Sequence, residues 1–128
     1  MGSRNILILA GISGALAVGL GAFGAHGLEP MLEAAGRVDT FETAVSYHFY
    51  HTLLLVGLGI LNDKLDDRFS GLAVIFVTAG IIIFSGSLYI LCLTGVTWLG
   101  AVTPIGGICL IVGWLLLARS ALSSFKKT

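Results

Sequence analysis

Three long windows of the chain contain no Asp, Glu, Lys or Arg: residues 5–28, 43–62 and 69–118. A helix of ~20 apolar residues crosses a bilayer core of ~30 Å. The first two windows have room for one crossing each, and the third has room for two crossings joined by a turn. The pattern therefore predicts an all-α, four-helix transmembrane bundle with spans at residues 6–25, 40–61, 69–93 and 103–118. These spans form one integral membrane domain over residues 1–128.

The polar segment 27–39, between the first two spans, predicts a short amphipathic helix at the membrane surface. Its apolar residues recur every three or four positions, which places them on one side of a helix. Asp39 stands three residues before Glu42, a spacing that resembles a capping box and predicts that the second span starts near Thr40. Asp66 or Asp67 is placed in the same way to cap the third span.

Composition and charge support a membrane protein. Of 128 residues, 56% are apolar and 11% are charged, whereas charged residues approach a quarter of a soluble domain. This excludes a soluble enzyme, a nucleic-acid-binding protein and a disordered chain. With four spans, the two termini and the 62–68 turn share one side, which carries six of the seven Lys and Arg residues. The positive-inside rule then predicts that both termini lie in the cytoplasm.

The start of the chain also fits a cleaved leader, because Arg4 precedes an apolar run that ends in small residues. The uncharged run is, however, longer than the ~7–15 residues of a typical leader core. We therefore expect the first span to be retained.

Small residues fall on helical faces, where they allow close approach of helices inside lipid. The first span has two such faces, and we expect it to touch two neighbours as the most buried member of the bundle. One face contains Gly11, Ala15, Gly19 and Ala22, and the other contains Gly14 and Gly21 among alanines. Gly106 and Gly113 share one side of the fourth span with Thr103 and Cys109.

Ionisable and hydroxyl side chains gather, by residue count, in the half of the bundle opposite the termini. This candidate polar cluster consists of His26, Glu42, Tyr47, His48, Tyr50, His51, Tyr89 and Thr103. In the first interpretation, these groups hydrogen-bond one another and fix the helix ends, since unpaired polar groups are costly in hydrocarbon. Ser85 and Ser87 are interpreted in the same way, as contacts between helices.

Two other interpretations assign chemistry to the cluster. His48 and His51, three residues apart, are expected to face the same way, and His26 with Glu42 or Glu29 would complete a zinc site or contribute to a haem site. Alternatively, the histidines carry protons or accompany transport, which would need an oligomer because four small helices leave little room for a pore.

Cys92 and Cys109 either form a bridge or remain free thiols. Lys126 and Lys127 are interpreted as a topology anchor.

Several motifs carry a resemblance to a known family. They are the runs GAFGAHGL (21–28) and FETA (41–44), Tyr47 with Tyr50-His51, and, further on, GSLY (86–89), WLG (98–100), TPIGG (103–107) and GW (113–114). Together they resemble the YgdD-like family of small bacterial inner-membrane proteins of unknown function, which has eukaryotic transmembrane relatives. The resemblance implies four helices and a retained first span. His26 and His51 match motif positions, whereas His48 stands where another polar residue is expected, which argues against a three-histidine metal site.

We therefore expect a non-enzymatic protein that supports the membrane or envelope or assists another membrane component. We expect no cofactor and no bound metal. The lipid bilayer is its surrounding partner, and a homo-oligomer or association with other membrane proteins stays open.

Overall fold

The structure is a computed structural model that describes the backbone of residues 1–125 and the side chains of residues 1–124. Within this range the chain is helical and has no strand. The α-helices are α1 (Ser3–His26), α2 (Glu29–Ala35), α3 (Val38–Leu61), α4 (Asp67–Gly80), α5 (Gly86–Thr94) and α6 (Thr103–Phe125). Two 3-10 turns, η1 (Asn62–Lys64) and η3 (Thr97–Ala101), and a π-helical segment, η2 (Ile81–Ser85), connect them. The anchor expected at Lys126 and Lys127 lies outside the described residues.

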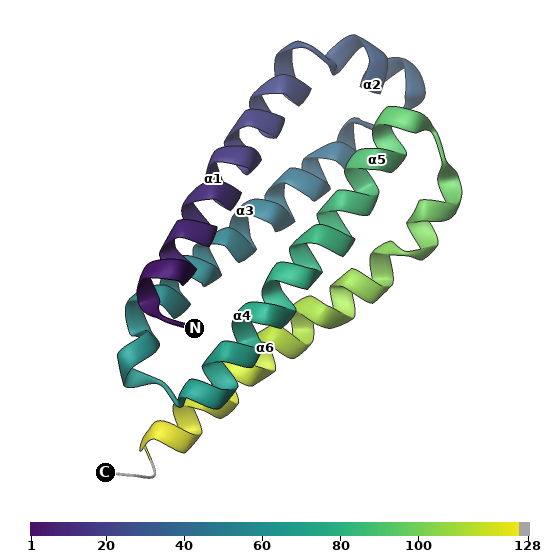
Figure 1. Ribbon diagram of the computed structural model, residues 1–128. Helices are drawn as coiled ribbons and strands as arrows, with labels where there is room; N and C mark the ends of the chain where they lie inside the picture. The colour runs from purple at the N-terminus through teal and green to yellow at the C-terminus, as the bar shows by residue number, and fades with distance from the viewer. Residues whose placement is uncertain (126–128) are drawn as a thin grey trace.

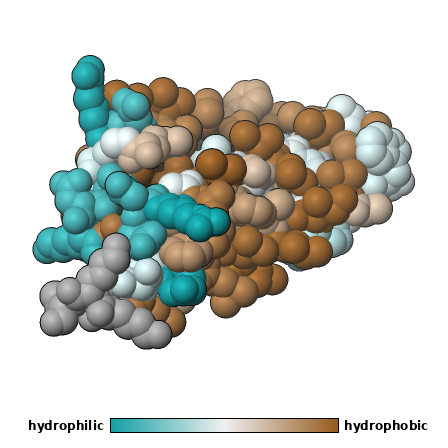
Figure 2. Space-filling view, turned by 60° about the horizontal axis from the view of Figure 1, so that its bottom comes forward, coloured by the Kyte–Doolittle hydropathy of each residue, from teal (hydrophilic) through white to brown (hydrophobic). Residues whose placement is uncertain are grey.

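The predicted four spans are confirmed, since four helical stretches are long and apolar enough to cross a membrane. The third is composite, because α4, η2 and α5 follow one another without a break. Figure 1 shows the four stretches side by side, with the N-terminus and the end of α6 at one end and α2 at the other. We call these the termini end and the α2 end. On the face that Figure 2 shows, the middle of the molecule is largely apolar and polar residues gather at the termini end.

Local sequence explains where the helices begin. Asp66 caps α4, because its carboxylate accepts hydrogen bonds from the backbone N–H groups of Arg68 and Phe69. The predicted cap at Asp39 is wrong: α3 begins at Val38, and Asp39 already lies in its first turn. Gly36, with φ of 65°, ends α2 in the left-handed region that glycine favours and leads directly into α3.

The helices pack as two close pairs, α1 with α3 and α4 with α6, and α3 joins the pairs by contacting α4, η2 and α5. Close approach at glycines holds the second pair together. A Cβ at Gly106 would overlap the backbone of Phe84, and one at Gly113 would lie 2.5 Å from the Val77 side chain. Gly106 and Gly113 of the fourth span therefore face the interior of the bundle, as predicted.

The two small faces of α1 differ in what they contact. The face with Gly14 and Gly21 packs against α3, where added Cβ atoms would lie 3.5 Å from Thr52 and 3.1 Å from Val45. The other face, Gly11, Ala15, Gly19 and Ala22, is exposed. The expectation that the first span is the most buried one is wrong, because the chain places α1 at the edge of the bundle with α3 as its main neighbour.

Candidate functional site

His48 is the centre of a hydrogen-bonded group that links three helices. Its Nδ1 lies 3.1 Å from the Tyr89 hydroxyl of α5, and its Nε2 lies 3.1 Å from the Ser13 hydroxyl of α1. Ser13 Oγ lies 2.6 Å from Thr52 Oγ1, one turn further along α3. We call Ser13, His48, Thr52 and Tyr89 the His48 network. Hydroxyls both donate and accept, so this network is satisfied with either nitrogen of His48 protonated.

His51 has partners that fix its protonation state. Its Nδ1 lies 2.7 Å from the backbone carbonyl of Tyr47, and the indole N–H of Trp114 in α6 donates to its Nε2 at 3.2 Å. A carbonyl can only accept and an indole N–H can only donate. His51 is therefore neutral, with its proton on Nδ1. Tyr47 stacks on both the His51 ring and the Phe84 ring, with centroids 5.8 and 4.5 Å apart.

The two buried histidines do not form one site. His48 faces α1 and α5, whereas His51 faces α6, because α3 lies between α1 and the α4–α6 pair and has neighbours on both sides. His51 lies at the edge of the half of the bundle in which the cluster was predicted. His51 is 13 residues from the start of α3, which is about 20 Å at 1.5 Å per residue and near the middle of the helix.

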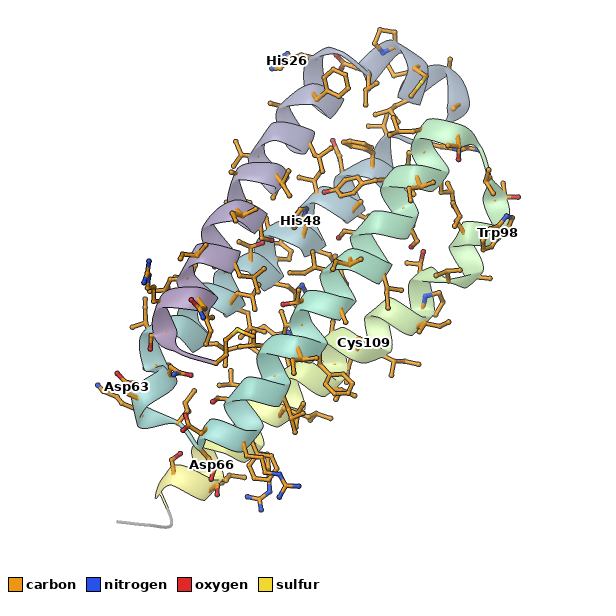
Figure 3. The ribbon with its side chains drawn as sticks, in the orientation of Figure 1. His26, His48, Asp63, Asp66, Trp98 and Cys109 are labelled. Carbon is orange, nitrogen blue, oxygen red and sulfur yellow. The ribbon has the colours of Figure 1, made fainter. Side chains whose placement is uncertain are left out.

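The remaining members of the candidate cluster are dispersed. His26 lies at the exposed C-terminal end of α1, well away from His48 (Figure 3), and Glu42 and Tyr50 are also exposed. Thr103 is buried and hydrogen-bonds to Ser87 at 2.7 Å, which joins the start of α6 to α5. The expected single cluster is thus divided into the His48 network, the His51 contacts and the Ser87–Thr103 pair.

This arrangement contradicts the three-histidine metal alternative. Within residues 1–124, no group of three His, Cys, Asp or Glu side chains is placed to hold a metal ion. No buried side-chain nitrogen or oxygen of this part of the chain lacks a hydrogen-bond partner.

Ser85 also bonds across helices, donating to the backbone carbonyl of Ala44 at 2.7 Å. Cys92 and Cys109 are free thiols.

Sequence reasoning missed Ser13 and Trp114, which complete the two histidine environments. A signal existed for each. Ser13 is the one hydroxyl residue within 6–25, and polar groups inside a membrane normally face protein. Trp114 lies midway along α6, away from both interfaces where tryptophan usually sits. Its ring is half exposed, and inside hydrocarbon its N–H needs an acceptor, which His51 supplies.

Two polar contacts near the helix ends were also missed. At the termini end, the hydroxyls of Ser120 and Ser123 donate to the Asp66 backbone carbonyl and carboxylate, each at 3.0 Å. At the α2 end, the Arg37 guanidinium donates to the Leu91 carbonyl at 3.0 Å, in the last turn of α5. Each contact ties a connecting segment to a helix that is more than 50 residues away in the sequence, as side-chain donors commonly do at helix ends.

The sequence is similar to a family of membrane proteins. Residues 20–107 match the family model described as "Protein of unknown function (DUF423)". The UPF0382 membrane protein YwdK of Bacillus subtilis is 44% identical over 92% of this chain and 96% of its own. The UPF0382 membrane protein SSP2132 of Staphylococcus saprophyticus is 46% identical over 89% and 93%. The UPF0382 inner membrane protein YgdD of Escherichia coli K12 is 36% identical over 99% and 96%. No solved structure matches.

Proposed function

Because the chain belongs to the DUF423 family, whose relatives are named UPF0382 membrane proteins, we propose that it is a non-enzymatic structural component of the membrane. In this role it supports the envelope or assists another membrane protein. The resemblance stated from the sequence motifs is confirmed by these matches, and four apolar helices make the chain an integral membrane protein.

The observation that supports this proposal is that polar side chains within the spans form hydrogen bonds between helices. His48, His51, Ser85 and Thr103 each bond to a different helix from their own. Such bonds contribute about 0.6–2 kcal/mol each in a membrane. Together they join α1, α3, α5 and α6, so the polar residues contribute to helix packing.

A complementation experiment tests the proposal. We expect cells that lack the protein to become sensitive to detergent or chelator. Tyr89→Phe and Ser87→Ala each remove one interhelical bond, and we expect both to restore resistance if the variant protein reaches wild-type levels in the membrane. Failure of such a folded variant would indicate that the side chain performs chemistry, contrary to the proposal.

A second measurement addresses the ligand and transport alternatives directly. The protein is purified in native lipid, and zinc, iron and haem absorbance are measured per chain. We expect substoichiometric amounts and no proton flux in liposomes above a protein-free control. Stoichiometric zinc or haem that is lost in His51→Ala but kept in His26→Ala would contradict the proposal. A flux abolished by His48→Ala would also contradict it.

We also propose that the protein lies in the bacterial inner membrane with both termini in the cytoplasm. The N-terminus, the end of α6 and the 62–66 turn share one end of the fold. Of the five Lys and Arg residues whose side chains the structure describes, four lie in segments of that end and Arg37 lies at the α2 end. This asymmetry supports the orientation through the positive-inside rule.

A further inference from the structure

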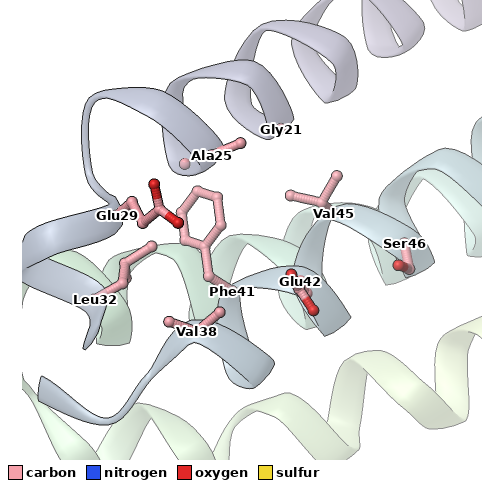
Figure 4. A pocket seen from close by; sticks show the side chains of 10 residues that line it. Gly21, Ala25, Glu29, Leu32, Val38, Phe41, Glu42, Val45 and Ser46 are labelled. Carbon is pink, nitrogen blue, oxygen red and sulfur yellow. The ribbon is translucent and has the colours of Figure 1, made fainter.

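A pocket of about 310 Å³ opens at the α2 end between α1, α2 and α3. Figure 4 shows its walls converging on the Phe41 ring. Phe41 and Leu32 are 3% and 2% exposed, so the inner wall is apolar and firmly packed. Gly21 and Val45 form the side that runs down between α1 and α3. The pocket therefore offers an apolar cleft to a molecule that enters from the membrane surface.

Three polar side chains also line this pocket: Glu29 from α2, and Glu42 and Ser46 from α3. None of the three forms a hydrogen bond or ion pair with another described side chain or backbone group. Arg37, the one Lys or Arg that the structure describes at the α2 end, is engaged with the Leu91 carbonyl. Two carboxylates and a hydroxyl therefore remain available to a ligand.

The depths of these groups suit an amphiphile. Glu42 and Ser46 lie four and eight residues after Val38, which places them about 6 and 12 Å along α3. Glu29 starts α2, beside the same end of α3. The carboxylates thus lie at the depth of lipid headgroups, and the hydroxyl lies where the hydrocarbon begins.

We propose that this pocket binds the ammonium headgroup of an amphiphile. The ammonium group lies between the Glu29 and Glu42 carboxylates, and the apolar body follows Gly21 and Val45 toward the hydrocarbon. Ser46 hydrogen-bonds to an oxygen or nitrogen below the headgroup. Four acidic residues against Arg37 at this end disfavour an anionic headgroup. The inference goes beyond the proposed structural role, which stands whether or not an amphiphile binds.

Lipid retention tests the proposal with a charge-matched control. The full chain is placed in nanodiscs of equimolar phosphatidylethanolamine and phosphatidylglycerol, and retained lipid is counted by native mass spectrometry. We expect phosphatidylethanolamine to be enriched, and the Glu29→Gln/Glu42→Gln variant to lose about five- to tenfold of that preference, as expected for two exposed charge pairs. Glu33→Gln/Asp39→Asn removes the same charge at the same end but outside the pocket, and it should retain the preference.

A second arm distinguishes a lipid headgroup from a free amine. Dodecylamine and neutral dodecanol are titrated separately onto the protein in a non-ionic detergent. Enrichment of phosphatidylethanolamine assigns the lipid headgroup, whereas binding of dodecylamine without that enrichment assigns a free amphiphilic amine. Ala25→Leu fills the pocket with both carboxylates intact and should abolish either kind of binding. Equal binding of dodecylamine and dodecanol with no lipid preference would overturn the proposal, as would an equal loss in the control variant.

Discussion

Gly106 of α6 packs directly against the backbone of the π-helical segment. A Cβ added there would overlap the backbone of Phe84, which cannot rotate away as a side chain can. At Gly107 the same atom would lie 3.7 Å from the Phe84 ring, an ordinary contact. We expect Gly106→Ala to lower the free energy of unfolding by about 1–3 kcal/mol, because the two helices must separate.

Gly107→Ala is the matched control, since it adds the same methyl group to the same turn of α6. Unfolding in detergent, followed by circular dichroism, should show a loss for Gly106→Ala and little change for Gly107→Ala. Equal effects of the two substitutions would contradict the close approach.

The sequence indicated which polar side chains are buried, but it did not indicate their hydrogen-bond partners. His48, His51 and Tyr89 were expected to face protein, and they are buried. Their partners depend on rotamers and on which helix lies beside which. His48 and His51 are 60° apart around the helix axis, and this difference is enough to direct them to opposite neighbours. No spacing rule within one helix could have predicted that division.

Among the helices, α1 gives the clearest contrast between small residues that pack and small residues that do not. A Cβ at Gly24 would overlap the Phe41 ring, whereas one at Gly19 would meet nothing within 4 Å. We expect Gly24→Ala to destabilise the α1–α3 pair by about 1–3 kcal/mol. Gly19→Ala should leave the free energy of unfolding unchanged or raise it, since alanine favours helix.

The comparison needs only the two melting curves in the same detergent. A destabilised Gly19→Ala protein would mean that the exposed face of α1 is covered by another chain in solution. In that case the other chain would be the second neighbour of α1 that the sequence predicted.

Helix positions could be predicted well because they depend on the distribution of charge along the chain, which the sequence displays directly. The third span contains a feature that the charge distribution does not mark. Its hydropathy is continuous, so nothing marked the π-helical segment at Ile81–Ser85. This segment holds Ser85, which donates to the Ala44 carbonyl of α3. A π-helical turn inserts one residue into the helical repeat, often at a functional position, and leaves no apolar signature.

For the whole molecule, orientation in the membrane is the main testable consequence of the charge distribution. In a background lacking Cys92 and Cys109, single cysteines are introduced as Ser3→Cys, Ser124→Cys and Glu33→Cys. A membrane-impermeant thiol reagent added to spheroplasts should label Glu33→Cys alone. The other two variants should react only after permeabilisation. Labelling of Ser3→Cys or Ser124→Cys in intact spheroplasts would contradict the proposed orientation.

The sequence predicted four helices that cross the membrane, but it could not predict which helices pack against each other. Two small faces on α1 suggested two neighbours, yet only one face packs, because α3 occupies the position between α1 and the α4–α6 pair. Which glycine stripe packs depends on how the helices are arranged together, and a single sequence does not carry that information.

We infer that the imidazoles within the spans serve to join helices. Nitrogen-15 magnetic resonance of the histidine side chains, with the protein in lipid bilayers at neutral pH, tests this inference. We expect His51 to be neutral with its proton on Nδ1, and we expect Trp114→Phe to shift its Nε2 resonance whereas Tyr50→Phe does not. A proton on Nε2, or a charged imidazolium, would overturn the inference, because neither could accept the hydrogen bond from Trp114.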